Sequence, residues 1–199
     1  MMKLLDGKHI VLASNSPRRK ELLKGLELDF EVRILQDIDE SYPDSLQGEE
    51  IPKYISLQKA RAYLSTVKSD EVLITSDTIV YLNGRVLGKP KDEQDACNML
   101  RALSGCTHEV ITGVTVVYGQ ENAEPRISSF ATTTKVTFKE LTDEEILHYV
   151  KVYKPFDKAG AYGIQEWIGY IGVRAIEGSY FNVMGLPVQR LYEELSRNQ

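Results

Sequence analysis

One carboxylate stands out because apolar residues flank it on both sides. Asp77 lies between the apolar runs 72–75 and 79–82, which together predict a buried strand with the aspartate near its middle. Burying an ionised carboxylate is costly unless a cation or hydrogen bonds compensate it. Asp77 is therefore a candidate for holding a metal ion or polarising a water. The alternative is a structural aspartate whose oxygens accept bonds from nearby backbone N–H groups.

A basic segment is the second candidate. We expect a strand at residues 10–13 and a helix that begins at Pro17, because Ser16 is a good cap and proline suits the first helical position. The helix dipole favours acidic side chains there by roughly 0.3–1 kcal/mol each, yet the first turn carries Arg18-Arg19-Lys20. Backbone N–H groups beside guanidinium groups predict a phosphate site. A solvated basic turn is the alternative.

Weaker candidates lie elsewhere in the chain. Lys89 stands between Gly88 and Pro90, a rigid setting that could aim its ammonium at a phosphate. Glu40 ends an acidic loop and could supply a second carboxylate, although such loops are usually only solvated. Lys59 lies on a predicted helix, where lysines usually face solvent.

Composition narrows the function classes. The 199 residues are 42% hydrophobic, which suits one globular domain or two small lobes. The net charge of −5 argues against nucleic acid as the main partner. No apolar run approaches the roughly 18 residues that span a bilayer, and no secretory signal precedes residue 10, so we expect a cytoplasmic protein without a membrane partner. Cys97 and Cys106 lack zinc-site spacing, and we expect them to be free thiols.

Strand and helix signals alternate along the chain and predict an α/β or α+β fold with a mixed sheet. The Asn83-Gly84 pair predicts a tight hairpin, and Thr142 with Glu145 forms a capping box. The expected strands are residues 10–13, 29–35, 72–82, 85–87, 110–118 with a break at Gly113, and 132–138. The expected helices start at Pro17, span residues 51–67 and 92–103, start again at Asp143, and follow Pro187.

The motifs together resemble the Maf nucleotide pyrophosphatases, also called septum formation inhibitor proteins. No P-loop, dinucleotide-binding fingerprint or nucleophile elbow competes with this interpretation. The matching blocks occur in family order over nearly the whole chain: residues 13–19, 76–78, 87–90, 103–105, 108–114, 157–165 and 178–187.

The resemblance implies a single domain, residues 1–199, with two lobes, a fold similar to inosine triphosphate pyrophosphatases, and a nucleotide cleft between the lobes. It also implies hydrolysis of a nucleoside triphosphate to the monophosphate and pyrophosphate with a divalent metal, Mg²⁺ or Mn²⁺. Asp77 would be the proton acceptor, and Glu40 with Asp77 would hold the metal. Relatives often dimerise, so a homodimer is compatible with the resemblance. The substrate-binding residues would be Ser14, Arg18, Arg19, Lys59, Thr78, Lys89 and Gln165.

Three positions are associated with base choice in that family, and here they are Arg19, Thr78 and Gln165. The combination resembles the subgroup that acts on dTTP and UTP rather than the one that prefers 7-methyl-GTP. Ser76 departs from the small apolar residue of many relatives, and its hydroxyl could alter the hydrogen bonding of Asp77. Two alternatives stay open: a nucleotide-binding regulator of cell division without turnover, and a purine triphosphate pyrophosphatase.

Overall fold

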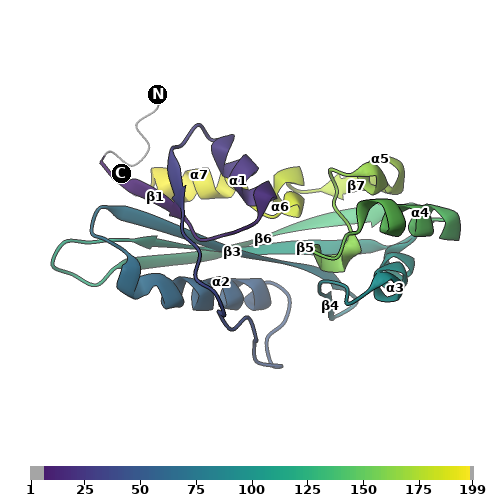
Figure 1. The fold of residues 1–199 in the computed structure, drawn as a ribbon, viewed down its shortest axis with the longest axis horizontal. Coiled ribbons are helices and arrows are strands. Elements are labelled where there is room, and N and C mark those ends of the chain that lie inside the picture. The colour runs from purple at the N-terminus through teal and green to yellow at the C-terminus, as the bar shows by residue number, and fades with distance from the viewer. Residues whose placement is uncertain (1–6, 198–199) are drawn as a thin grey trace. The chain divides into compact units, whose positions relative to one another are not determined.

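The computed structural model describes residues 7–197. Within these residues, seven strands form one sheet with the order β2-β1-β3-β5-β6-β7, and β4 pairs with β3 (Figure 1). β1 is parallel to β2 and β3, whereas the β3–β4 and β6–β7 pairs are antiparallel, so the predicted mixed sheet is confirmed. The strands are β1 (His9–Leu12), β2 (Phe30–Val32), β3 (Glu71–Leu82), β4 (Arg85–Leu87), β5 (Thr107–Tyr118), β6 (Arg126–Phe138) and β7 (Val173–Glu177).

The described residues also form seven α-helices and two short 3-10 helices. None of them within residues 7–197 has the length and apolar character needed to cross a membrane. The α-helices are α1 (Pro17–Lys24), α2 (Glu50–Tyr63), α3 (Glu93–Leu103), α4 (Asp143–Tyr153), α5 (Trp167–Gly172), α6 (Tyr180–Met184) and α7 (Val188–Ser196). The short 3-10 helices are η1 (Leu64–Thr66) and η2 (Ala159–Ala161).

The chain divides into two compact units. The first comprises the residues up to Asp77, Thr112–Thr132 and the residues from Gly185 onward, and the second comprises Thr78–Ile111 and Thr133–Met184. Strands β3, β5 and β6 contribute residues to both units. Asp77 is therefore the last residue of its segment in the first unit, and Thr78 opens the second.

Helices cover both faces of the strands in the first unit. Val117 of β5 packs with Ala60 and Tyr63 of α2, whereas the neighbouring Tyr118 donates a hydrogen bond of 3.2 Å to the Glu194 carbonyl oxygen in α7. Successive strand residues point to opposite faces, so α2 and α7 lie on opposite sides, as Figure 1 also shows. This arrangement explains why residues 72–75 of β3 form a continuous buried run.

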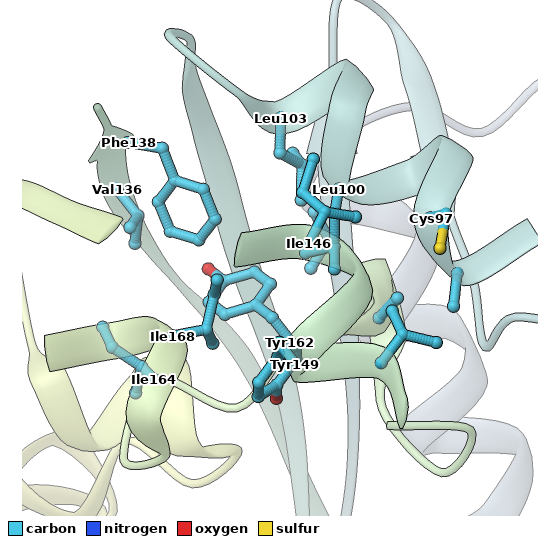
Figure 2. Close-up of a cluster of buried hydrophobic side chains, with 14 of the residues drawn as sticks. Cys97, Leu100, Leu103, Val136, Phe138, Ile146, Tyr149, Tyr162, Ile164 and Ile168 are labelled. Atoms are coloured by element: carbon cyan, nitrogen blue, oxygen red, sulfur yellow. The ribbon is translucent and has the colours of Figure 1, made fainter. Parts of the chain in front are cut away.

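The second unit has its own apolar core (Figure 2). The helical period of α3 and α4 turns Leu100, Leu103, Ile146 and Tyr149 inward, where they are almost fully buried. The predicted capping box at the start of α4 is present. Cys97 is buried, and both cysteines are free thiols, as expected.

Several predicted boundaries were wrong, each for a tertiary reason. β2 ends at Val32 rather than continuing to residue 35, and the apolar side chain of Ile34 remains exposed. Gly113 does not interrupt β5: a Cβ there would lie 2.2 Å from the Pro52 carbonyl, so glycine lets α2 approach the strand closely. Helix α2 changes to 3-10 geometry after Tyr63. The sequence patterns did not predict β7, α5 and α6.

Candidate active site

Asp77 lies within β3, as predicted, on the face of the strand that α2 covers. Two residues earlier on that face, Thr75 donates a 2.7 Å hydrogen bond to the Ser56 carbonyl oxygen of α2. The Asp77 side chain is only 13% exposed. A carboxylate in this position requires a compensating positive charge or several hydrogen-bond donors.

Lys59 of α2 supplies that positive charge. Its Nζ lies 2.9 Å from Asp77 Oδ1 and 3.0 Å from Glu40 Oε1. The Lys59 side chain is 13% exposed, so the general expectation of a solvent-facing lysine does not apply here. Glu40 comes from the loop before α2 and is about half exposed. The structure thus brings together three of the residues assigned to one site, and we call them the Lys59 cluster.

The Lys59 cluster contains more carboxylates than ammonium groups. Two carboxylates share one ammonium, and the buried Arg19 guanidinium also interacts electrostatically with both of them. Mg²⁺ typically takes one or two protein carboxylates and completes its octahedron with water and substrate phosphate. Among residues 7–197, no group of three or more His, Cys, Asp or Glu side chains could hold a metal by itself. Glu40 and Asp77 therefore fit a metal that the substrate helps to coordinate.

The segment before α1 is folded as its sequence predicts. Ser16 caps the helix by accepting a 3.4 Å hydrogen bond from the Arg19 N–H, and Pro17 is the first helical residue. Ser14 is buried, and its Oγ accepts from the Ser16 N–H at 3.3 Å. The first turn contains no acidic residue, so its positive end is offered to an external anion.

Arg19 connects this segment to the strand that carries Asp77. Its Nε donates to the Gly185 carbonyl oxygen and its Nη1 to the Ser76 carbonyl oxygen, each at 2.8 Å. Burial lowers the pKa of Arg19, and the nearby Asp77 carboxylate opposes this shift. The guanidinium stays protonated and braces the backbone immediately before Asp77. This bracing contact was not foreseen from the sequence.

Ser76 does not modify Asp77 in the way its sequence position allowed. Its side chain lies on the opposite face of β3, where Oγ donates to the Gly185 carbonyl oxygen at 3.4 Å. Ser76 and Asp77, although adjacent in β3, therefore contact different partners.

Three further predicted residues belong to the second unit. Thr78 follows Asp77 in β3, and Lys89 is exposed just after β4. The Gln165 amide oxygen is buried, and no residue among 7–197 donates a hydrogen bond to it. An acceptor in this state is suited to a donor from a ligand.

Sequence reasoning missed a polar network in the second unit that involves Tyr149, Lys158 and Glu166. The sequence analysis assigned no role to Tyr149. The available signal was its type, because a buried tyrosine usually needs a partner for its hydroxyl.

Comparisons with known proteins show which proteins this chain is similar to. The chain is 60% identical to the dTTP/UTP pyrophosphatase of Phocaeicola vulgatus, over 99% of this chain and 100% of that one. It is 50% identical to a dTTP/UTP pyrophosphatase of Porphyromonas gingivalis, over 98% and 96% of the two chains. The Ham1 protein of Staphylococcus aureus has a similar fold, with a TM-score of 0.50 and 17% identity over 96% of this chain and 100% of that one. Residues 9–198 match the family described as Maf-like protein, and the chain belongs to that family.

Proposed function

We propose that this protein hydrolyses dTTP and UTP to the nucleoside monophosphate and pyrophosphate. The observation that carries the proposal is the Lys59 cluster, in which two carboxylates converge on one cation beside a braced strand. Relatives that are 50–60% identical over nearly the full chain bear the name of this activity. A carboxylate that is only 13% exposed and paired with a lysine suits the activation of water better than binding alone, so we favour the enzyme over the regulator.

The proposed chemistry assigns a separate task to each residue of the cluster. Asp77 accepts a proton from the water that attacks the α-phosphorus, and the bond to the bridging oxygen of pyrophosphate breaks. Glu40 and Asp77 would hold the divalent metal, Mg²⁺ or Mn²⁺, which when bound would supply charge neutralisation at the phosphates and a lower pKa for water. Lys59 pairs with both carboxylates through its ammonium group.

Phosphate and base recognition are assigned within each unit separately. In the first unit, Ser14, Arg18 and the N–H groups at the start of α1 provide an anion site, and Arg19 braces the strand next to it. In the second unit we assign Lys89 to phosphate and Thr78 with Gln165 to the base. The buried oxygen of Gln165 matches the N3–H donor of uracil and thymine.

The wider setting of this activity is also a proposal. Removing modified pyrimidine triphosphates would keep noncanonical nucleotides out of nucleic acid, and such substrates place the enzyme in the cytoplasm. The net charge of −5 does not favour nucleic acid itself as a ligand. A homodimer is compatible with this role.

The test is product analysis with a nucleotide panel. The protein is incubated with Mg²⁺ and separately with dTTP, UTP, CTP, GTP, ATP and 7-methyl-GTP, and the products are resolved by chromatography. We expect monophosphate and pyrophosphate from dTTP and UTP. Diphosphate and phosphate would mean that the wrong bond is cleaved, and a preference for GTP or ATP would favour the purine alternative. Tight binding of UTP without any product would favour the regulator.

A further inference from the structure

Tyr149 makes two hydrogen bonds from inside the core of the second unit. Its side chain is fully buried among the apolar residues of the cluster shown in Figure 2. The hydroxyl accepts a 3.0 Å hydrogen bond from the Gly163 N–H and donates a short one to Glu166 Oε2. The phenol thus joins two residues that lie on either side of Gln165.

Charged neighbours fix the orientation of this phenol. The second oxygen of Glu166 lies 3.1 Å from Lys158 Nζ, and the same Nζ lies 2.7 Å from Asp157 Oδ1. Burial, with the Glu166 carboxylate as a second cause, raises the pKa of Tyr149, so the hydroxyl remains protonated and acts as the donor. Because Lys158 and Glu166 are themselves mostly buried, this network has little freedom to rearrange.

The network holds the short segment that carries Gln165. The Glu166 N–H donates to the Gly163 carbonyl oxygen at 3.0 Å, which closes a tight turn around Gln165. The Gln165 amide folds back over this turn, since a Cβ at Gly163 would lie only 3.0 Å from its Nε2. The Gln165 amide thus lies close to the Gly163 backbone, and the position of this turn limits where the amide can lie.

We propose that Tyr149 is a positioning residue for pyrimidine selection, acting through Gly163 and Glu166 on the amide of Gln165. The inference rests on the proposed function. Gln165 presents a buried acceptor oxygen, which suits the N3–H of uracil or thymine and opposes the N3 lone pair of cytosine. Discrimination between a donor and an acceptor at one atom requires that the amide be held in one orientation.

The test is a double-mutant cycle that measures kcat and KM for UTP and for CTP. The variants are Tyr149→Phe, Gln165→Ala and the double substitution, with Tyr153→Phe as the matched control. Tyr153 is on the same helix and stacks on Tyr149, with ring centroids 5.1 Å apart, but its side chain is about one-third exposed. We expect Tyr149→Phe to lower the UTP to CTP ratio of kcat/KM about tenfold, mainly through the KM for UTP. The same change in the Gln165→Ala background should leave the ratio unaltered, because the group being positioned is already absent.

A second pair of variants keeps the test independent of the folding of Tyr149→Phe. Glu166→Gln retains an acceptor for the phenol and should preserve the UTP to CTP ratio, whereas Glu166→Leu removes the acceptor and should lower it. An unchanged ratio in both Tyr149→Phe and Glu166→Leu, with wild-type preference for UTP intact, would overturn the inference and leave the proposed function standing. Equal effects of Tyr149→Phe with and without Gln165 would also overturn it. A wild-type protein without preference for UTP over CTP would contradict the proposed function and the inference together.

Discussion

The first unit contains two ion-pair sites, the Arg33–Glu71 pair and the Lys59 cluster, in which similar charged groups are arranged differently. At the Arg33–Glu71 pair, one carboxylate receives several donors: Arg33 Nη2 at 2.7 Å, Arg33 Nη1 at 2.9 Å and the Lys68 N–H at 3.0 Å. At the Lys59 cluster, one ammonium is shared by two carboxylates. The first site has a surplus of donors, and the second has a surplus of acceptors.

This difference separates a structural pair from a site prepared for a ligand. The planar guanidinium of Arg33 matches the Glu71 carboxylate in two parallel bonds, and this contact lowers the pKa of Glu71 to about 2. A metal ion would find no unpaired carboxylate there. At the Lys59 cluster two carboxylates share a single ammonium at 2.9 and 3.0 Å, and we propose that a divalent cation can join this arrangement.

Asp77→Asn should cause the largest change. The amide keeps the shape of the carboxylate but cannot accept the proton from water, so kcat for UTP should fall by about 10³-fold or more. Thermal unfolding should change little, because the amide oxygen can still accept from Lys59. Pyrophosphate release measures the first quantity and a melting curve the second. Asp44→Asn removes the same charge from an exposed position of the same unit and should keep wild-type kcat. Substantial turnover by Asp77→Asn would remove the main distinction between the two sites.

Glu71→Gln should show the opposite pattern. It leaves the Arg33 guanidinium without its carboxylate partner at a site where the Glu71 side chain is only 4% exposed. We expect a loss of about 2–3 kcal/mol in the free energy of unfolding, with kcat of the folded protein unchanged. Urea titration and pyrophosphate release check the two parts. Glu31→Gln is the matched control, because its contact with Arg33 is mostly exposed and should contribute less than about 0.5 kcal/mol.

Lys59→Met should make the stability of the protein depend on metal. Without the ammonium, Asp77 and Glu40 lose the cation that pairs with both of them, and we expect a loss of about 1–2 kcal/mol in the free energy of unfolding. Millimolar Mg²⁺ should restore most of this loss in a urea titration. Arg33→Met leaves the single Glu71 carboxylate without its partner, and Mg²⁺ should not restore it. Equal responses of the two variants to Mg²⁺ would show that the sharing of one ammonium by two carboxylates does not distinguish the two sites.

The two sites also differ in how far sequence could predict them. Asp77 was identified because its own neighbours are apolar, and the α1 cap and the Asn83-Gly84 hairpin were predicted from equally local signals. The burial of Lys59 could not be predicted, since it depends on how α2 lies across β3.

The Arg33–Glu71 pair escaped notice for a related reason. The two residues are 38 positions apart and meet only because β1 pairs in parallel with both β2 and β3. Tyr149 was not singled out from the sequence, because its hydroxyl contacts depend on the path of a loop that no periodic pattern describes. Features set by neighbouring residues could be predicted from the sequence, whereas contacts set by strand order and loop path could not.

Acid titration should reveal the smallest of these effects. The folded pKa of Glu71 is depressed to about 2 from 4.5, so its pairing contributes stability that is complete above pH 4.5 and is lost as pH falls toward 2. The stability difference between wild type and Glu71→Gln should therefore shrink by about 0.8 kcal/mol between pH 7 and pH 4.

His108 titrates in the same interval and must be separated from Glu71. Burial lowers the pKa of His108 from 6.5 to about 4, so the unfolded chain binds its proton first and stability falls as pH drops below 6.5. This loss, about 3 kcal/mol by pH 4, occurs in wild type and in Glu71→Gln alike and cancels in their difference. Urea midpoints of both proteins at pH 7, 5.5 and 4 therefore isolate Glu71. A difference that stays constant over these three values would mean that the Arg33 contact is equally strong with a protonated partner, and that shape rather than charge holds the pair together.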